Sequence, residues 1–221
     1  MSNPFVEFLR PHKTVPQTPW TARSRWDLSL PRVSVLFFGL FIFGLGDALL
    51  IQSTIGNAPW SVLAQGISGK FDITMGWATF AISSVVLLLW IPLKEKPGFG
   101  TISNITIIAA AIQLGVSIFP KQDNFFIAVA YCLVGISMVG FGSALYITCG
   151  LGPGPRDGLM TSLHKVSGVR IGRVRLAIEG SVLIIGWLLG GTVGLGTLLF
   201  ALLIGQSIAI GLGVVSRVTS K

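Results

Sequence analysis

Five charged side chains lie within or directly beside long apolar segments of the chain: Asp47, Arg156, Asp157, Arg175 and Glu179. Ionisable groups are costly in hydrocarbon, so such residues usually form a site or an internal ion pair. A guanidinium group presents a fork of donors that suits a carboxylate or a phosphate. The three acids can supply counter-charge or hold a coupling ion. These five residues, called the charged cluster below, are therefore predicted to bind a substrate.

The same side chains also have structural interpretations. Glu179 follows Arg175 by one helical turn, so a local pair near the lipid headgroups explains both residues. Asp47 has no charge at helical spacing on its own segment. It therefore either meets Arg156, Arg173 or Arg175 from another segment, or it titrates. The sequence leaves these interpretations open.

Two glycine- and proline-rich stretches, 54–76 and 150–172, interrupt the apolar segments. In each, a glycine is followed three residues later by a proline: Gly56 and Pro59, Gly152 and Pro155. Proline is favoured in the first helical turn, and a helix that begins there points free N–H groups and a positive dipole end at an anion. We expect a helix start or hinge at each pair, followed by a short amphipathic or re-entrant helix. The alternative is an interfacial helix whose basic residues bind lipid phosphates.

The composition indicates an integral membrane protein. Hydrophobic residues make up 52% of the chain and charged residues 11%, whereas soluble domains carry about a quarter charged residues. The net charge of +8 gathers at the ends of apolar segments, which favours lipid headgroups over nucleic acid as partner. Cys132 and Cys149 have no metal-ligand spacing, so we expect packing roles for them, with no metal and no cofactor. No Ser/His/Asp or Cys/His arrangement suggests an enzyme.

Six apolar segments are long enough to cross a bilayer: 33–55, 73–93, 101–119, 125–148, 174–190 and 195–215. Lys and Arg are abundant in the N-terminal tail, at Lys94 and Lys96, in the 150–175 connection and at the C-terminal end, and sparse in the other connections. Positive charge favours the cytoplasmic side of a membrane. The pattern therefore predicts six spans, with both termini in the cytoplasm.

The chain also contains an internal repeat. Gly56 and Gly152 are 152 − 56 = 96 residues apart, and the same offset aligns many other glycines of the two halves. Each copy holds three spans, an odd number, so consecutive copies enter the membrane in opposite senses. The expected fold is all-α and polytopic, with two inverted three-helix repeats. The expected organisation is a basic cytoplasmic tail (1–32), a first repeat (33–119), a second repeat (125–215) and a short cytoplasmic tail (216–221).

The two copies differ in charge. Trp60, Ser61, Thr79 and Ser83 of the first copy correspond to Arg156, Asp157, Arg175 and Glu179 of the second. Topology gives a reason for the two arginines but none for the two acids. The difference favours a functional role for the second copy.

The residues GLGPGPRDGLMTSLHKVSG at 150–168, then Arg173, Arg175 and Glu179, and GWLLGGTVGLGTLLFALLIG at 186–205, resemble the YczE/YyaS/YitT family of bacterial integral membrane proteins. The resemblance runs over about residues 33–213 and is densest in the second copy. It implies a multi-pass protein of the bacterial cytoplasmic membrane, and it brings no established reaction.

Together these features predict a small secondary transporter or permease for a small polar or anionic solute. The alternative is a non-transporting partner that stabilises or regulates another membrane or biosynthetic protein. The expected partners are membrane lipids, a small solute and a second copy of the chain, with no nucleic acid.

Overall fold

The computed structural model describes residue 11 and residues 14–219, and every regular element in this part of the chain is a helix. The helices are α2 (Leu30–Gln52), α3 (Pro59–Phe71), α4 (Met75–Leu88), α5 (Trp90–Leu93), α6 (Phe99–Ile118), α7 (Phe125–Thr148), α8 (Pro155–Ser167), α9 (Ile171–Leu188) and α10 (Leu195–Thr219). The predicted segments agree with these helices to within a few residues. Residues 1–10, 12 and 13 of the predicted N-terminal tail and the last two residues lie outside the described residues.

Local chemistry explains where the helices begin. Pro59 and Pro155 occupy the first turns of α3 and α8, as predicted. The side chain of Asn124 accepts hydrogen bonds from the backbone N–H groups of Phe126 and Ile127 and so caps α7. Thr74 caps α4 in the same way through the N–H of Trp77.

Among the described residues, five helical segments are long and apolar enough to cross a membrane, and the chain is accordingly a multi-pass integral membrane protein. They are α2, α4 with α5, α6, α7 and α10. The sixth predicted span, α9, is 18 residues long but contains Arg173, Arg175 and Glu179, and it does not qualify on composition. Length and apolar character therefore support five of the six predicted spans.

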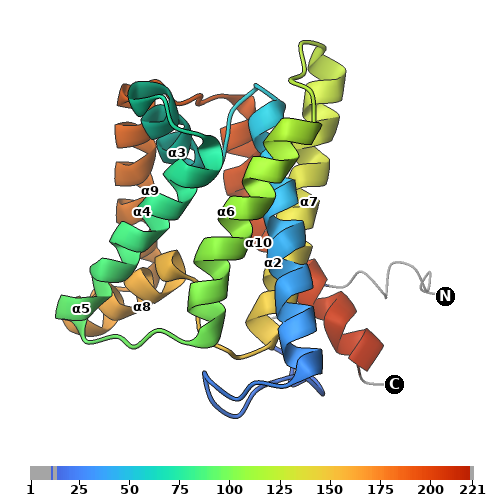
Figure 1. Ribbon diagram of the computed structural model, residues 1–221, viewed down its shortest axis with the longest axis vertical. Helices are drawn as coiled ribbons and strands as arrows, with labels where there is room; N and C mark the ends of the chain where they lie inside the picture. The colour runs from blue at the N-terminus through green and yellow to red at the C-terminus, as the bar shows by residue number, and fades with distance from the viewer. Residues whose placement is uncertain (1–10, 12–13, 220–221) are drawn as a thin grey trace.

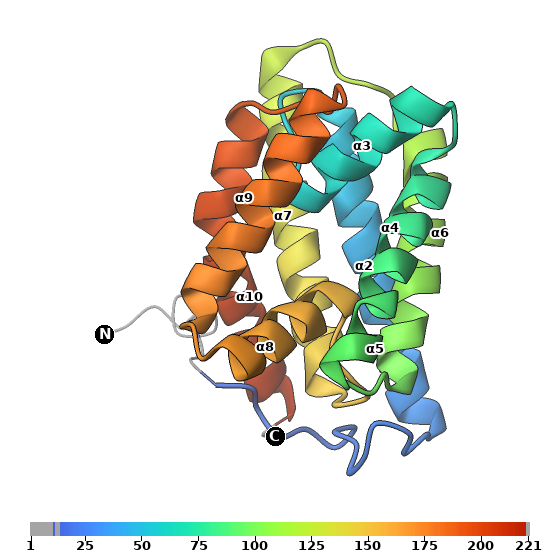
Figure 2. The ribbon, with the colours of Figure 1, turned by 90° about the vertical axis from the view of Figure 1, so that its left-hand side faces the viewer.

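The helices form two groups (Figure 1). In one group, α6, α2, α7 and α10 pack side by side in that order. In the other, α9 and α4 pack on α3, and α8 packs against α4, α5 and α9. The short helices α3 and α8 lie at opposite ends of the molecule (Figure 2). Contacts between α4 and α6 join the two groups along one side.

The crossing of α2 and α7 is the most extensive helix contact in the described part of the chain, and glycines make it close. A Cβ atom at Gly46 would lie 2.7 Å from the carbonyl oxygen of Gly135, and one at Gly142 would lie 2.5 Å from that of Gly39. Small residues permit such approach between membrane helices. The two contacts are equivalent under the 96-residue offset, with the halves exchanged, because Gly39 corresponds to Gly135 and Gly46 to Gly142.

The same exchange relates the two connections that precede α3 and α8. The N–H of Gly196 donates to the carbonyl of Ile55 (2.9 Å), and the N–H of Gly100 donates to the carbonyl of Leu151 (2.8 Å). Gly56 and Gly152 have φ angles of 122° and 116°, which a residue with a Cβ rarely adopts. Each half therefore holds the turn that starts the short helix of the other half.

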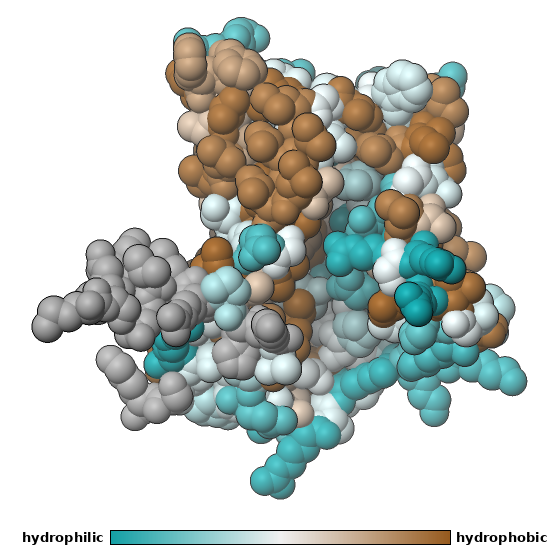
Figure 3. All heavy atoms as spheres, turned by 180° about the vertical axis from the view of Figure 1, so that it is seen from behind, coloured by the Kyte–Doolittle hydropathy of each residue, from teal (hydrophilic) through white to brown (hydrophobic). Residues whose placement is uncertain are grey.

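The contact between α4 and α6 has no counterpart between α9 and α10. The N–H of Gly76 in α4 donates to the side-chain oxygen of Gln113 in α6 (3.1 Å), and α4 packs along α6. Gly172, the corresponding residue of α9, has nothing within 4 Å of the position of a Cβ. Because α9 packs mainly on α3 and α10 mainly on α7, α9 and α10 are set apart. Figure 3 shows this face hollowed between two apolar columns, with hydrophilic residues gathered in the hollow.

Candidate substrate-binding site

A cavity of about 250 Å³ lies between the two helix groups, and residues of both halves line it. One wall is charged and comes from α8 and α9, with Arg156, Asp157, Arg175 and Glu179. The facing wall is apolar and comes from α7 and α10, with Val139, Phe200, Ile204 and Ile208. Four of the five residues of the predicted charged cluster therefore meet at one cavity.

The start of α8 is held firmly at this cavity. The hydroxyl of Thr101 donates to the carbonyl of Pro153 (2.8 Å), and the indole N–H of Trp90 donates to the carbonyl of Pro155 (3.0 Å). Trp90 fits because Gly158 carries no side chain: a Cβ there would lie 1.9 Å from the Trp90 ring. These contacts fix the backbone from which Arg156 and Asp157 project.

Arg156 lies over the indole ring of Trp60, with the guanidinium carbon 5.1 Å from the ring centroid. This distance is within the range of a cation–π interaction. Among the described residues, Arg156 forms no hydrogen bond and no ion pair within 4 Å with another side chain. The indole N–H of Trp60 is buried and has no partner among the described residues either. Both groups line the cavity with donors that no part of the described chain satisfies.

The acids of the charged wall are each hydrogen-bonded through one oxygen. The hydroxyl of Tyr146 donates to Oδ2 of Asp157 (2.8 Å), and Nε of Arg175 donates to Oε1 of Glu179 (3.0 Å). The second contact is the local pair expected from the helical spacing of Arg175 and Glu179. The pair also lines the cavity. A local ion pair and a part in a binding site are therefore both compatible with Arg175 and Glu179.

Asp47 is placed differently from the rest of the charged cluster. Its side chain is 2% exposed, does not line the cavity, and has both carboxylate oxygens 2.8 Å from the hydroxyl of Ser61. Arg156 acts on Asp47 electrostatically, but the two form no ion pair within 4 Å among the described residues. The partner in contact with Asp47 is therefore a hydroxyl group of α3, whereas the sequence left open an arginine partner or a titrating Asp47.

The predicted helix-start residues are found at the site. Pro59 and Pro155 both line the cavity, and no side chain caps α3 or α8. Gly56 and Gly152 form the turns that lead into these helices. The positive ends of two helix dipoles are therefore directed at the cavity from opposite ends of the molecule (Figure 2).

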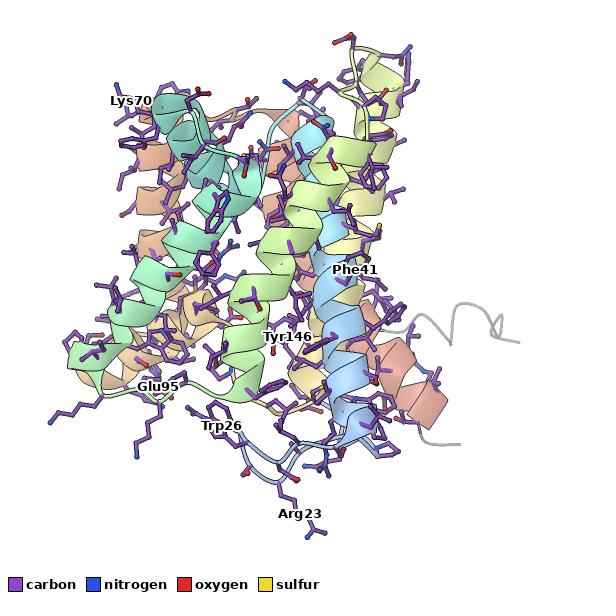
Figure 4. All side chains as sticks on the ribbon, in the orientation of Figure 1. Arg23, Trp26, Phe41, Lys70, Glu95 and Tyr146 are labelled. Carbon is purple, nitrogen blue, oxygen red and sulfur yellow. The ribbon has the colours of Figure 1, made fainter. Side chains whose placement is uncertain are left out.

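Five polar residues of the cavity lining were absent from the predicted site: Trp60, Ser83, Asn104, Ser143 and Tyr146. Trp60 carried a usable signal, because it corresponds to Arg156 at the 96-residue offset. Asn104 was visible only as one polar residue within an apolar segment. Tyr146 lies near the end of an apolar segment and carried no signal that separated it from an interfacial aromatic residue (Figure 4).

A second charged contact lies outside the cavity, at the end of the molecule where α5 and α8 meet. Glu95 forms salt bridges with Arg25 (2.8 Å) and Lys165 (3.4 Å). The hydrogen bond from Arg25 is the main reason that the pKa of Glu95 lies below its ordinary value. Glu95 and Arg23 lie at this end and Lys70 at the other (Figure 4). The contact attaches the segment before α2 to α8.

Comparison with known proteins identifies relatives over nearly the whole chain. The family described as "Family of unknown function (DUF6198)" matches residues 30–212. A Haemophilus influenzae protein named "Uncharacterized protein" is 43% identical over 205 residues, which are 93% of this chain and 94% of that protein. Two Bacillus subtilis proteins also match: "Uncharacterized membrane protein YczE" (29% over 79% of this chain and 82% of that protein) and "Uncharacterized protein YyaS" (27% over 81% and 91%). The expected relationship to YczE and YyaS is confirmed.

A shorter match is to a protein whose name states an activity. The "Na(+)/H(+) antiporter NhaA" of Geobacter sulfurreducens is 39% identical over 85 residues, which are 38% of this chain and 21% of that protein. The match covers too little of that protein to carry its activity to this chain. No solved structure matches the chain significantly.

Proposed function

This chain belongs to the family of unknown function DUF6198, and from that premise we propose that it is a small secondary transporter for a small polar or anionic solute. One observation carries the proposal. A cavity between the two helix groups collects polar side chains that have no partner among the described residues, including Arg156 and the indole N–H of Trp60. Buried polar groups are normally satisfied, so a polar ligand is the natural partner for these.

The arrangement of the helices favours two inverted repeats around this cavity. The starts of α3 and α8 (Pro59, Pro155), of α4 and α9 (Met75, Ile171), and of α6 and α10 (Phe99, Leu195) are each 96 residues apart, for example 155 − 59 = 96. The short helices of the pair lie at opposite ends (Figure 2). In this proposal α9 is the sixth span, and its low apolar character reflects Arg175 and Glu179, which line the cavity.

The charge distribution favours one orientation, in the cytoplasmic membrane of a bacterium. The end that holds Arg23, Glu95 and α8 also receives Arg25, Lys94 and Lys96, whereas the end with Lys70 is poor in cations (Figure 4). The positive-inside bias would place the first end, with both termini, in the cytoplasm. The proposed binding site would then lie between the repeats, as in other transporters built from inverted repeats.

Transport needs a second state, and the difference between the halves suggests what it is. Here α4 is closed against α6 through Gly76 and Gln113, while α9 stands apart from α10. In the exchanged state, α9 would close against α10 and α4 would leave α6. Gly172 and Ala209, the counterparts of Gly76 and Gln113, would then come into contact. We propose that the solute passes through unchanged, without an enzymatic step.

The test is ligand-dependent stability of the purified protein in detergent. A panel of small anions, cations, zwitterions and neutral polar molecules is screened for a rise in melting temperature. A ligand that binds only the folded state at 100 times its Kd stabilises it by about 2.7 kcal/mol. The rise should be lost in Arg156→Gln and kept in Arg173→Gln. Arg173 is an exposed arginine of α9 outside the cavity lining and serves as the matched control.

The ligand found is then tested for uptake into proteoliposomes. Binding without uptake would overturn the proposed transport. Absence of any stabilising ligand would favour the non-transporting partner, whose loss would lower the level of another membrane or biosynthetic protein.

A further inference from the structure

The cavity holds charges of both signs on the same wall. Arg156 and Arg175 face it together with Asp157 and Glu179. Asp47, Asp157 and Glu179 each act electrostatically on Arg156, so a ligand that approaches the arginine also meets negative charge. Like charges at contact distance repel. A ligand of one sign would gain at one group and lose at its neighbours.

The free hydrogen-bonding capacity of the wall also has both polarities. Donors without a partner among the described residues are the Arg156 guanidinium and the buried N–H of Trp60. On the acceptor side, Asp157 and Glu179 each use only one oxygen in hydrogen bonds within the described chain, Oδ2 and Oε1 respectively. The other oxygen of each acid is available to a ligand that donates.

The wall opposite the charges is apolar, and the cavity is small. Phe200, Ile204 and Ile208 of α10 form the wall opposite the charges. The volume of about 250 Å³ is below the roughly 300–1,000 Å³ of pockets for drug-sized ligands. The ligand must therefore be small, with a polar end for α8 and α9 and an apolar end for α10.

We infer that the cavity binds a small zwitterion with an apolar side group: an acidic group beside Arg156 and Trp60, and an ammonium group beside Asp157 and Glu179. The inference rests on the proposed function and names its solute class. A free apolar amino acid has this chemistry. The phosphoethanolamine head of a membrane lipid shares the pairing of an acidic group with an ammonium group, and the gap between α9 and α10 would admit it from the side.

The test compares four probes on the purified protein by thermal shift and calorimetric titration: L-leucine, N-acetyl-L-leucine, L-leucinamide and glycine. Leucine carries both charges and an apolar group, and each other probe lacks one of these. Leucine should bind at least about tenfold more tightly than each of the others. A separate arm measures stability in phosphatidylcholine nanodiscs with and without phosphatidylethanolamine. Competition between leucine and that lipid would identify the lipid as the source of the ligand in the membrane.

A variant separates the roles of the charges. In Asp157→Asn the new side chain keeps an oxygen for the hydroxyl of Tyr146 but loses the negative charge. Leucine should bind about tenfold more weakly to this variant, and N-acetyl-leucine more tightly than to the unchanged protein. Lys165→Gln, in the last turn of the same helix and outside the cavity lining, should change neither affinity.

Equal binding of leucine and N-acetyl-leucine would overturn the inference, and so would the absence of binding by leucine and by phosphatidylethanolamine. In either case another member of the wider panel could still bind and be taken up. The proposed transport is therefore judged separately, by the uptake of that ligand. A leucine affinity that Asp157→Asn leaves unchanged would also contradict the inference.

Discussion

The Arg156 guanidinium lies over the Trp60 ring at the edge of the cavity, and the two residues are separated by the repeat offset, 156 − 60 = 96 residues. In the proposed inverted repeats, an approximate twofold axis exchanges these two positions, and residues so exchanged can touch only near the axis. The contact would then mark the place where the two halves meet. Because one partner is a cation and the other an aromatic ring, this place is chemically asymmetric.

Topology can be tested at a second pair of equivalent positions. Lys70 and Val166 are 166 − 70 = 96 residues apart, are both exposed, and lie near the ends of α3 and α8. Single cysteines at these positions, with Cys132 and Cys149 replaced, should react with a membrane-impermeant reagent from opposite sides. We expect position 70 to label in intact cells and position 166 only in inverted vesicles. Labelling of both from the same side would contradict the inverted repeats.

The exchange of states can be tested by cross-linking. A Cβ at Gly76 would lie 2.7 Å from that of Gln113, closer than the roughly 3.5–4.5 Å of a disulfide, so the pair Gly76→Cys and Gln113→Cys should form one after only a small separation of α4 and α6. The pair Gly172→Cys and Ala209→Cys should form one more slowly, because it requires α9 to close on α10. Each disulfide should lock the cavity and stop uptake, with recovery on reduction. Uptake that continues undiminished in either fully cross-linked variant would rule out the exchange.

The glycine crossing of α2 and α7 predicts opposite effects for two similar substitutions. Gly142→Ala should destabilise the protein by about 1–3 kcal/mol, because the new Cβ would lie 2.5 Å from the carbonyl oxygen of Gly39. Gly205→Ala, in α10 with nothing within 4 Å, should stabilise it by about 0.5–1 kcal/mol. Unfolding in a detergent series measures both. Equal changes in stability would show that the crossing is looser than the structure indicates.

The contact of Glu95 with Arg25 predicts an acid-sensitive attachment of the segment before α2. The folded protein holds the pKa of Glu95 below its ordinary value of 4.5, chiefly through the hydrogen bond from Arg25. A lowered pKa stabilises the folded form above the unfolded value, and this stabilisation is lost as the pH falls through the folded pKa, below 4.5. The protection of residues 20–27 against hydrogen exchange, measured relative to the intrinsic exchange rate at each pH, should therefore fall in acid.

Glu95→Gln should remove this dependence and give fast exchange of the same segment at neutral pH. The control is Asp72→Asn, which removes an exposed acid that follows α3 at the opposite end of the molecule. It should leave the exchange of residues 20–27 unchanged. Acid-sensitive exchange that persists in Glu95→Gln would assign the effect to another group.

Much of the fold follows from local features of the sequence. Long apolar runs define the membrane helices, and Pro59 and Pro155 mark the starts of the short ones. The offset of 96 residues pairs the elements. The cluster of Arg156, Asp157, Arg175 and Glu179 was predictable because ionisable residues are costly in apolar segments and usually form a site or an ion pair there.

Contacts between distant segments could not be read in the same way. Ser61 as the partner of Asp47, and Tyr146 as that of Asp157, depend on how α2, α3, α7 and α8 come together. The separation of α9 from α10 was also hidden: α9 carries Arg173, Arg175 and Glu179 where α4 is apolar, but this difference does not say whether α9 packs on α10. The empty space beside Gly172 becomes visible only in the structure.

The packing of α9 on α3 has a consequence for biogenesis. A charged residue at the centre of a helix opposes insertion by about 2.5–3.5 kcal/mol, and α9 carries three charges in 18 residues. Gly186 of α9 rests against Val62 and Leu63 of α3, a helix made more than a hundred residues earlier. In the proposed six-span arrangement, α9 would therefore insert beside α3, which is already synthesised and offers it a packing surface. We expect the second half, expressed without the first, to insert α9 poorly.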